Sequence, residues 1–336
     1  MNILYQFDNS YAPFAGVSMT SLFENNQEME FDVYILGENL SSENIEILNE
    51  FASKYHRKLI FIDTSCVVNQ LELLGIPQYR GSYATNLKMF LPEIFKSEKG
   101  RILYIDSDTV IVNALSELEH FDLEEMPLAM AFDSLGKKHA KEIGLSTCEG
   151  YYNAGVILFD LQKWKELDCT RKIVRYVKEV RAHYMAPDQD LINIVLKNKI
   201  QKLPMQYNIQ PIHLRFQQQQ YNKIFRPGKY YSNDEMCMAL EKPIILHFFR
   251  FAGEFPWNKD SQHPCAEVFD LYLSKSPWKN YEKQKPIQNG FLFKIERFFY
   301  RYMPDEIFLF IFKIAYDLFI KKCSIDSQNG KSNRLM

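Results

Sequence analysis

The chain has 336 residues, 46% of them hydrophobic, which is enough to bury the core of one or two domains. Its formal net charge of −2 provides no global field that would attract nucleic acid, so no nucleic-acid partner is expected. The glycine count of 13 is low and argues against a fibrous or low-complexity protein.

Three features of the sequence predict a cytoplasmic protein. The six cysteines lie far apart without a C-x-x-C pair, which favours free thiols in a reducing compartment. The first eight residues lack the basic and apolar regions of a signal peptide. The longest apolar run near the C-terminus, Ile307 to Phe312, is far shorter than the roughly 20 residues that a transmembrane helix needs.

Short apolar segments alternate with helical patterns over the first 200 residues. The predicted strands are Ile3–Phe7, Phe31–Leu36, Leu59–Asp63, Ile102–Ile105, Leu128–Phe132 and Val156–Leu161. A helix is predicted over Ser42–Tyr55, with Ser42 as its N-cap. This alternation predicts an α/β domain with a mostly parallel sheet and flanking helices, and ligands bind such sheets beyond the carboxyl ends of the strands.

The composition changes after about residue 200. Prolines punctuate residues 200–285, which predicts a loop-rich segment that closes over the sheet. Residues 1–285 are therefore expected to form one catalytic domain, 286–323 an amphipathic helical tail, and 324–336 a disordered end.

The tail combines basic and aromatic residues at helical spacing. Lys294, Arg297 and Arg301 recur opposite an apolar set that includes Phe291 and Phe298, and residues 279–322 hold nine Lys or Arg against five Asp or Glu. This pattern is typical of a helix that lies on a membrane surface, so peripheral association through 288–322 is expected. Packing against the catalytic domain as ordinary core is the alternative.

A predicted buried strand delivers two carboxylates in Arg101-Ile-Leu-Tyr-Ile-Asp106-Ser107-Asp108. In an extended chain, residues i and i+2 point to the same side, so Asp106 and Asp108 could hold one Mn²⁺ or Mg²⁺. A purely structural alternative is that the two acids cap the turn after the strand and bind no metal. A second alternative is a haloacid-dehalogenase-type phosphatase with Asp106 as nucleophile and Asp108 as acid/base, although the later acidic motif of that family does not occur here.

Five further segments accompany the D-x-D motif, in this order along residues 1 to about 260: Phe7-Asp8-Asn9-Ser10-Tyr11; Ser82 to Glu93; Tyr152-Asn153-Ala154-Gly155-Val156, which contains an N-A-G sequence; Asp188-Gln189-Asp190-Leu-Ile-Asn193; and Ile245-Leu-His247 with Gly253, Pro256 and Trp257. Together they resemble glycosyltransferase family 8, particularly the bacterial lipopolysaccharide glucosyl- and galactosyltransferases. The resemblance implies a Rossmann-like nucleotide-diphospho-sugar transferase fold of the GT-A type.

The resemblance also implies roles for individual residues. It implies a donor site made of Asp8, Ser10, Tyr11, Lys88, Asp106, Ser107, Asn153, Ala154, Asp188, Gln189 and Gly253. In this site Asp8 would accept a hydrogen bond from a uracil ring, Tyr11 would stack on that ring, Asp188 would bind sugar hydroxyls, and Ala154 and Gly155 would let the backbone approach closely. A strand-to-helix turn capped by Asp8 is the alternative for the first segment. It implies three metal ligands, which are Asp106, Asp108 and His247. It implies a catalytic group of Asp133, Asp188 and Gln189, with Asp133 facing the acceptor and Gln189 near the anomeric carbon.

The last segment departs from the family pattern H-x-x-G-x-x-K-P-W. Nine residues instead of seven separate His247 from Pro256, and Phe255 stands where the family has Lys. Arg250 or Lys259 could replace that phosphate-binding cation. A catalytically degenerate sugar-nucleotide-binding module is the non-enzymatic alternative.

By resemblance, the expected reaction moves glucose or galactose from a UDP-hexose to a glycan or lipid-linked saccharide, with retention of configuration. The expected cofactor is Mn²⁺ or Mg²⁺, and the expected location is the cytoplasm, peripherally at the inner face of the membrane, in lipopolysaccharide or cell-surface polysaccharide synthesis. Gln189 would be a poor nucleophile, so same-face attack is favoured over double displacement. Truncation after about residue 285 is expected to abolish liposome binding and to leave donor hydrolysis intact.

Overall fold

The computed structural model describes residues 1–76, 78–79, 82–95, 100–146, 150–180, 184–227, 230–286 and 290–328. Its strands are β1 (Asn2–Asp8), β2 (Val33–Glu38), β3 (Leu59–Ile62), β4 (Arg101–Asp106), β5 (Thr109–Ile111), β6 (Leu128–Phe132), β7 (Tyr152–Asp160), β8 (Ile200–Lys202) and β9 (Ile245–His247). Its α-helices are α1 (Ala12–Asn25), α2 (Ser42–Lys54), α3 (Ser65–Leu73), α4 (Leu91–Ile94), α5 (Gly136–Glu142), α6 (Leu161–Glu166), α7 (Cys169–Glu179), α8 (Pro187–Val195), α9 (Pro211–Arg215), α10 (Gln218–Phe225), α11 (Asn233–Glu241), α12 (Ala266–Lys275), α13 (Phe291–Tyr302) and α14 (Asp305–Gln328). Four 3-10 helices complete the chain: η1 (Asn9–Tyr11), η2 (Ala84–Phe90), η3 (Ser116–His120) and η4 (Met205–Tyr207).

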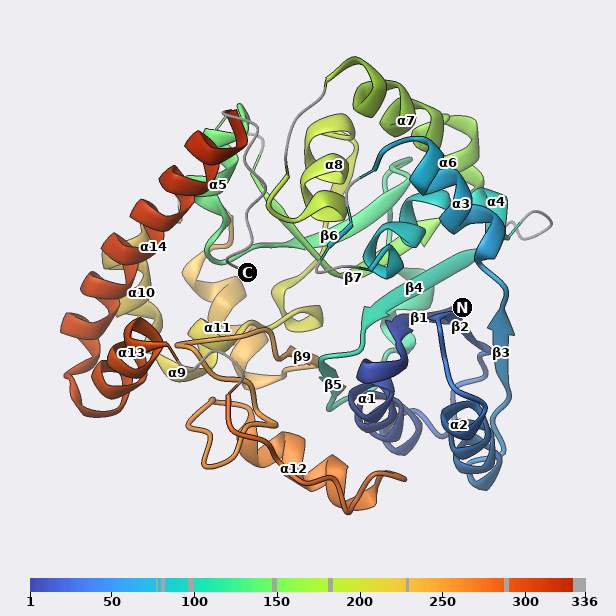
Figure 1. The fold of residues 1–336 in the computed structure, drawn as a ribbon, viewed down its shortest axis with the longest axis horizontal. Helices are drawn as coiled ribbons and strands as arrows, with labels where there is room; N and C mark the ends of the chain where they lie inside the picture. The colour runs from blue at the N-terminus through green and yellow to red at the C-terminus, as the bar shows by residue number, and fades with distance from the viewer. Residues whose placement is uncertain are drawn as a thin grey trace.

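A seven-stranded sheet with the order β3-β2-β1-β4-β7-β6-β8 forms the centre of the molecule (Figure 1). Strand β7 runs antiparallel to both β4 and β6, and the other neighbouring pairs are parallel. The predicted mostly parallel sheet is therefore confirmed. Because β7 is reversed, its first residues lie at the edge of the sheet where β1, β4 and β6 end.

Helices cover both faces of this sheet. On one face, Tyr5 of β1 packs with Met19 of α1 and Leu48 of α2 in a shared core. On the other face, Leu4 of β1 packs with residues of η2, α3, α6, α7 and α8, including the fully buried Trp164. Alternate residues of β1 thus face opposite cores, as expected for a strand buried on both sides.

Three local predictions need correction. The strand predicted over Val156–Leu161 corresponds to β7, which begins four residues earlier at Tyr152, and Leu161 is the first residue of α6. The N-cap of α2 is Ser41, whose hydroxyl oxygen accepts a hydrogen bond from the Asn44 backbone N–H at 3.2 Å, while Ser42 is already helical. The stretch predicted to be loop-rich contains the four short helices α9 to α12, two strands and a 3-10 helix. Its prolines do not all break helices, since Pro211 begins α9, where a missing N–H costs no hydrogen bond.

The C-terminal tail forms the helices α13 and α14, which lie along the left edge of the molecule in Figure 1. One side of this pair is buried: Tyr300, Phe308 and Leu309 pack with Ile212 of α9 and Tyr221 of α10. The helix α14 continues past the predicted boundary at 323 to Gln328, and residues 329–336 lie outside the described residues.

The other side of the tail is apolar and exposed. Eight of the twelve large apolar side chains described as exposed belong to α13 and α14: Phe291, Phe298, Tyr302, Ile307, Phe310, Ile311, Ile314 and Leu318. Their spacing places them in one stripe on each helix. The tail thus packs on the preceding part of the chain and presents an apolar stripe to its surroundings.

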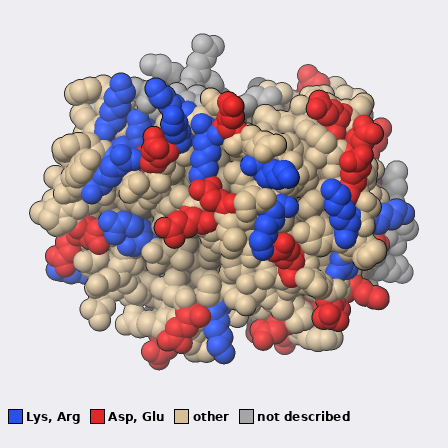
Figure 2. All heavy atoms as spheres, turned by 90° about the horizontal axis from the view of Figure 1, so that it is seen from below, with Lys and Arg blue, Asp and Glu red and all other residues tan. Residues whose placement is uncertain are grey.

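On the face of the molecule seen from below, basic and acidic side chains are interspersed with uncharged surface (Figure 2). Among the helices of the described ranges, none combines the length and the apolar character that a membrane span requires.

Candidate active site

A cavity of about 300 Å³ opens at the carboxyl edge of the sheet. Its wall is built from the ends of β1, β4 and β9, the start of β7, the start of α8 and part of η2. Of the residues predicted for the site, the cavity is lined by Asp8, Tyr11, Lys88, Asp106, Ser107, Asp108, Asp133, Asn153, Ala154, Asp188, Gln189 and His247. Ser10 and Gly253 are not among the lining residues, so their predicted contacts with a donor stay predictions.

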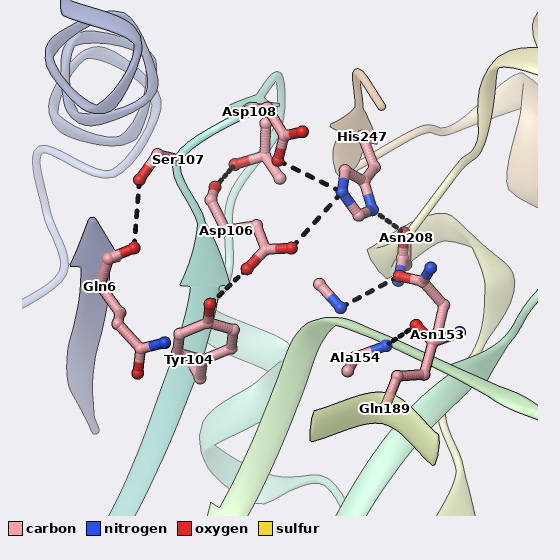
Figure 3. A network of polar contacts seen from close by, with 12 residues as sticks. Gln6, Tyr104, Asp106, Ser107, Asp108, Asn153, Ala154, Gln189, Asn208 and His247 are labelled. Atoms are coloured by element: carbon pink, nitrogen blue, oxygen red, sulfur yellow. Dashed lines mark hydrogen bonds and ion pairs between the residues drawn. The ribbon is translucent and has the colours of Figure 1, made fainter. Parts of the chain in front are cut away.

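The three predicted metal ligands come together at one end of the cavity (Figure 3). The Nε2 atom of His247 lies 3.3 Å from a carboxylate oxygen of Asp108 and 3.6 Å from one of Asp106. One potential ligand atom from each residue lies within 4.8 Å of the others. Antiparallel pairing of β5 with β9 sets this arrangement, because it places Thr109 opposite His247.

The His247 imidazole is oriented by Asn208. The Asn208 side-chain oxygen lies 3.1 Å from His247 Nδ1, and its amide donates to the Asn153 side-chain oxygen at 2.9 Å. A proton on Nδ1 leaves the lone pair of Nε2 facing the two carboxylates, which is the tautomer a metal ligand needs. Asn208 was not predicted, because it lies 39 residues before His247 in an irregular segment without a motif.

The same residues perturb one another electrostatically. The pKa of Asp106 is raised, chiefly because the surrounding protein partly removes the carboxyl group from water, with Lys88 opposing the shift and Asp108 adding to it. Burial disfavours the protonated form of His247, yet Asp108 and Asp106 outweigh burial and raise its pKa. Two like charges beside an imidazole thus form a site that favours a cation.

Lys88 is 1% exposed and lies on the floor of the cavity. Its ammonium group is 2.8 Å from a carboxylate oxygen of Asp188, 3.9 Å from Asp106 and donates to the Ala154 carbonyl oxygen at 3.1 Å. It also lies 4.0 Å from the centre of the Tyr104 ring, and the Tyr104 hydroxyl donates to Asp106. The resemblance placed Lys88 at the donor, and the structure shows that it also neutralises the predicted sugar-binding acid.

Asp133 and Gln189 belong to a second polar network. Asp133 Oδ2 accepts hydrogen bonds from the side-chain amides of Gln189 at 3.1 Å and Asn153 at 3.2 Å. The Gln189 side-chain oxygen accepts from the Ala154 backbone N–H at 2.9 Å. Asp133 and Gln189, two of the three predicted catalytic residues, therefore hold each other in fixed orientations at the cavity.

Asp190, the second acid of the D-Q-D motif, is fully buried behind this network. Its carboxylate accepts hydrogen bonds from the Tyr151 hydroxyl at 2.5 Å and from the backbone N–H groups of Met185 and Ala186 at 2.9 and 3.2 Å. His139 Nε2 lies 2.7 Å away. Asp190 therefore anchors the segment that carries Asp188 and Gln189.

The loop after β1 is shaped by Asp8. Its carboxylate accepts from the backbone N–H groups of Ser10 and Tyr11 at 2.9 and 3.2 Å, which caps η1. The Tyr11 ring lies edge-on to Phe14 and Trp257, so the residue predicted to stack on a base is itself positioned by aromatic packing. Both the capping and the binding interpretations are compatible with this geometry.

Two polar side chains at the cavity that have buried polar atoms were not predicted. Gln6 is 6% exposed, and neither polar atom of its amide has a hydrogen-bond partner among the described residues. The hydroxyl of Thr85 is likewise buried without a partner there. Both lie beside recognised motifs, but nothing in the sequence distinguishes them from core residues.

Replacement of Gly155 is expected to displace the metal ligands. A Cβ atom at this position would lie 2.1 Å from His247 Cε1 and 2.9 Å from Asp106 Oδ2. We expect Gly155→Ala to lower the affinity for Mn²⁺ by about 10- to 100-fold, because both ligands must move, and to reduce the free energy of unfolding by about 1–3 kcal/mol. Titration calorimetry with Mn²⁺ alone checks this.

Gly100→Ala is the matched control, because a Cβ there meets nothing within 4 Å. Equal Mn²⁺ affinity in the Gly155→Ala protein and the wild type would contradict the proposed site.

Comparison with known proteins identifies the family. The model of "Glycosyl transferase family 8" matches residues 2–261. The chain belongs to glycosyltransferase family 8. Its membership makes the chain a glycosyltransferase and disfavours the phosphatase interpretation of Asp106 and Asp108.

Curated relatives of this family 8 protein match most of its length. A lipopolysaccharide 1,2-glucosyltransferase of Escherichia coli strain K12 is 26% identical over 287 residues, covering 83% of this chain and 79% of the relative. A lipopolysaccharide 1,3-galactosyltransferase of Salmonella typhimurium is 24% identical, covering 85% of this chain and 81% of the relative. General stress protein A of Bacillus subtilis is 25% identical, covering 83% and 94%.

Solved structures share the fold. The galactosyltransferase LgtC, in complex with donor and acceptor sugar analogues, superposes with a TM-score of 0.66 at 22% identity, covering 82% of this chain and 96% of that one. The bifunctional glycosyltransferase WbbM gives a TM-score of 0.68 at 21% identity, and the match spans 51% of its length. The expected GT-A type fold of family 8 is confirmed.

Proposed function

We propose that this family 8 glycosyltransferase moves a hexose, glucose or galactose, from a UDP-sugar to a glycan acceptor with retention of configuration and with the help of Mn²⁺ or Mg²⁺. The observation that carries the proposal is the convergence of Asp106, Asp108 and His247 with the Lys88–Asp188 pair in one cavity. Relatives that are lipopolysaccharide glucosyl- and galactosyltransferases support a hexose donor and a role in cell-surface saccharide synthesis.

The three candidate metal ligands suit a hard divalent cation. Two carboxylates and one imidazole with a fixed tautomer are suitable ligands for Mn²⁺ or Mg²⁺, which bind nucleotide phosphates. A cation held there would supply Lewis-acid stabilisation of the departing diphosphate.

The protein groups position the donor around that end of the cavity. Asp8 and Tyr11 are suited to the polar edge and the face of a uracil ring. Asp188, neutralised by Lys88, is suited to accept hydrogen bonds from sugar hydroxyls, which would select the sugar. Asn153 and the Ala154 backbone line the same wall.

Arg250 is our candidate for the cation that replaces the family's Lys. It lines the cavity three residues beyond His247, whereas Lys259 is not among the lining residues. A guanidinium group there would compensate diphosphate charge in a cavity lined by five Asp residues.

The contacts of Gln189 favour same-face attack. Its side-chain carbonyl oxygen accepts a hydrogen bond from the Ala154 N–H, and its side-chain NH₂ group donates one to Asp133. The side-chain amide, a poor nucleophile, is therefore hydrogen-bonded to the protein through both its oxygen and its nitrogen. In same-face attack the Asp133–Gln189 pair would stabilise developing positive charge at the anomeric carbon. Mass-spectrometric detection of a glycosyl adduct on Gln189 or Asp133 would overturn this assignment.

The function is tested by thermal unfolding with a panel of nucleotide sugars, with and without Mn²⁺, followed by analysis of the product's anomeric configuration. A ligand that binds only the folded state raises the melting temperature. We expect Mn²⁺-dependent stabilisation by one UDP-hexose and product with retained configuration. No stabilisation by any nucleotide sugar would contradict the proposal, and binding without transfer to any glycan would favour the degenerate module.

We also propose that α13 and α14 dock the enzyme on a membrane surface, at the inner face of the cytoplasmic membrane. The exposed stripes are flanked by the exposed basic residues Lys294, Arg301, Lys321 and Lys322. An apolar stripe flanked by cations suits a bilayer surface with anionic lipids, where a lipid-linked saccharide acceptor would be found.

Replacement of three exposed tail residues is expected to release the protein from vesicles. We expect Phe298→Glu, Phe310→Glu and Leu318→Glu in one chain to reduce co-sedimentation with phosphatidylglycerol-containing vesicles at least about 10-fold, because apolar burial is lost and repulsive charge is added. The matched control replaces three exposed apolar residues outside the tail, Leu73, Met238 and Leu271, by Glu. Equal loss in both triple variants would contradict docking through the tail.

A further inference from the structure

One wall of the cavity is a loop that follows β9, and helix α13 lies behind it. Phe249, Arg250 and Phe255 of this loop line the cavity. The Phe255 ring stacks on Trp257 at 4.6 Å between ring centres, and Trp257 stacks on Phe14 of α1 at 4.1 Å. Aromatic packing therefore fixes the far end of the loop, while its first part depends on other contacts.

A tight turn shapes the middle of the loop. Phe251 and Glu254 exchange two backbone hydrogen bonds of 2.9 and 3.0 Å across Ala252 and Gly253, which have φ values of +49° and +76°. Two consecutive residues with positive φ are required by a type I′ turn, and Ala252 adopts this conformation at some cost. A turn that holds a non-glycine residue in this region needs support from its surroundings.

Helix α13 supplies that support with two arginines, which lie beside the buried carboxylate of Glu254 in the loop. Glu254 is 4% exposed, and its Oε1 atom lies 4.0 Å from Arg297 Nε and 3.8 Å from Arg301 Nη2. Its Oε2 atom accepts from the Gln262 backbone N–H at 2.7 Å. Arg297 additionally donates to the Gly253 carbonyl oxygen at 3.4 Å.

Three further contacts extend this attachment. The Arg250 guanidinium carbon lies 5.1 Å from the centre of the Phe293 ring of α13. Arg301 donates to the Asp260 carbonyl oxygen at 2.8 Å, and the Tyr300 hydroxyl donates to the Gln262 carbonyl oxygen at 3.1 Å. The contacts of α13 with the loop thus reach from the cavity-lining Arg250 to Gln262.

We propose that α13 is a positioning element of the donor site, in which Arg297 and Arg301, through Glu254, fix the loop that brings Arg250 and Phe255 to the cavity. This inference rests on the proposed function for the identity of the donor. The helix that presents Phe291, Phe298 and Tyr302 to the surroundings on one side therefore orders the donor-binding wall with its other side.

The inference changes the expectation for truncation. Removal of the chain after residue 285 deletes every α13 contact described above, so donor binding falls together with liposome binding. The sequence placed Arg297 opposite the apolar set of an amphipathic helix, and in the structure its side chain is 14% exposed and faces the loop.

The test uses the full chain with Arg297→Ala and Arg301→Ala combined. We expect the KM for the nucleotide sugar to rise about 10-fold because the loop loses its preferred position, with kcat and the acceptor KM within about two-fold of wild type. Arg297→Lys with Arg301→Lys retains both charges and is expected to restore most of the donor KM. Lys294→Ala, on the exposed side of α13, is the matched control and is expected to leave the donor KM, measured without membranes, unchanged.

Hydrogen exchange of the backbone amides of 251–255 gives a readout that needs no donor. Faster exchange in the Ala double variant, with Lys294→Ala unchanged, supports the positioning role even if the wild type binds no nucleotide sugar and the proposed function fails. Unchanged exchange and unchanged donor KM would overturn the inference and leave the proposed function standing. Equal losses in donor KM, acceptor KM, kcat and melting temperature would also overturn it, because they indicate general destabilisation.

Discussion

Asp108→Ala is expected to abolish Mn²⁺-dependent stabilisation by nucleotide sugars and to reduce transfer by about 10³-fold or more. The change removes one of the three candidate ligands and leaves Asp106 and His247 in place. The Asp108 carboxylate lies 3.3 Å from the His247 Nε2 atom, and Asp106 is the other carboxylate of the site. Removal of Asp108 therefore costs the site one ligand and half of its carboxylate charge. Differential scanning fluorimetry with and without Mn²⁺, and a transfer assay, measure the two effects.

The fold should survive this substitution, because Asp108 lies in a turn at the cavity and removal of one of two neighbouring acids relieves repulsion. Asp32→Ala, which removes an exposed acid before β2, is the control and is expected to behave as wild type. Retention of full Mn²⁺-dependent activity in Asp108→Ala protein would show that the cation binds elsewhere.

Lys88→Met is expected to lower the free energy of unfolding by about 3–5 kcal/mol, because it leaves the largely buried Asp188 carboxylate without its 2.8 Å partner. Transfer is expected to fall about 100-fold in the same variant, since Asp188 and Asp106 both lose the nearby cation. Urea unfolding followed by circular dichroism measures the stability change. Lys178→Met, on the exposed side of α7, controls for the loss of a lysine charge.

A double variant separates the structural and functional roles of Lys88. Lys88→Met with Asp188→Asn removes the unpaired charge, so most of the lost stability should return while activity stays low. A double variant as unstable as Lys88→Met alone would show that lost packing of the lysine chain, and not the unpaired carboxylate, causes the effect.

The structure also explains why one glycine is needed in the N-A-G segment. Gly155 lies so close to His247 and Asp106 that any side chain would enter the metal site. The resemblance implied a close backbone approach at this position, and the tertiary structure shows that the groups approached are the side chains of two candidate metal ligands, His247 and Asp106.

Local patterns in the sequence predicted six of the strands and one half of the site. Buried strands are short apolar runs, so β1, β4 and β6 could be predicted closely. The D-x-D motif was found at the end of β4, but Asp108 lies in the turn after the strand, so the turn and not the two-residue period of a strand brings its carboxylate beside Asp106. The predicted N-cap of α2, Ser42, was wrong by one residue, since the structure has Ser41 as the N-cap. The two residues have the same side chain, and only the backbone conformation distinguishes them.

Only the tertiary structure decided how distant segments meet. The pairing of β5 with β9 brings His247 to Asp108, and Asn208 orients it from a segment without a motif. The same holds for α13: periodicity showed an amphipathic helix, but which side is buried depends on Glu254, 43 residues before Arg297 in the chain. Sequence patterns record the local periodicity that backbone geometry imposes, whereas ion pairs and hydrogen bonds between distant residues depend on how the whole chain packs.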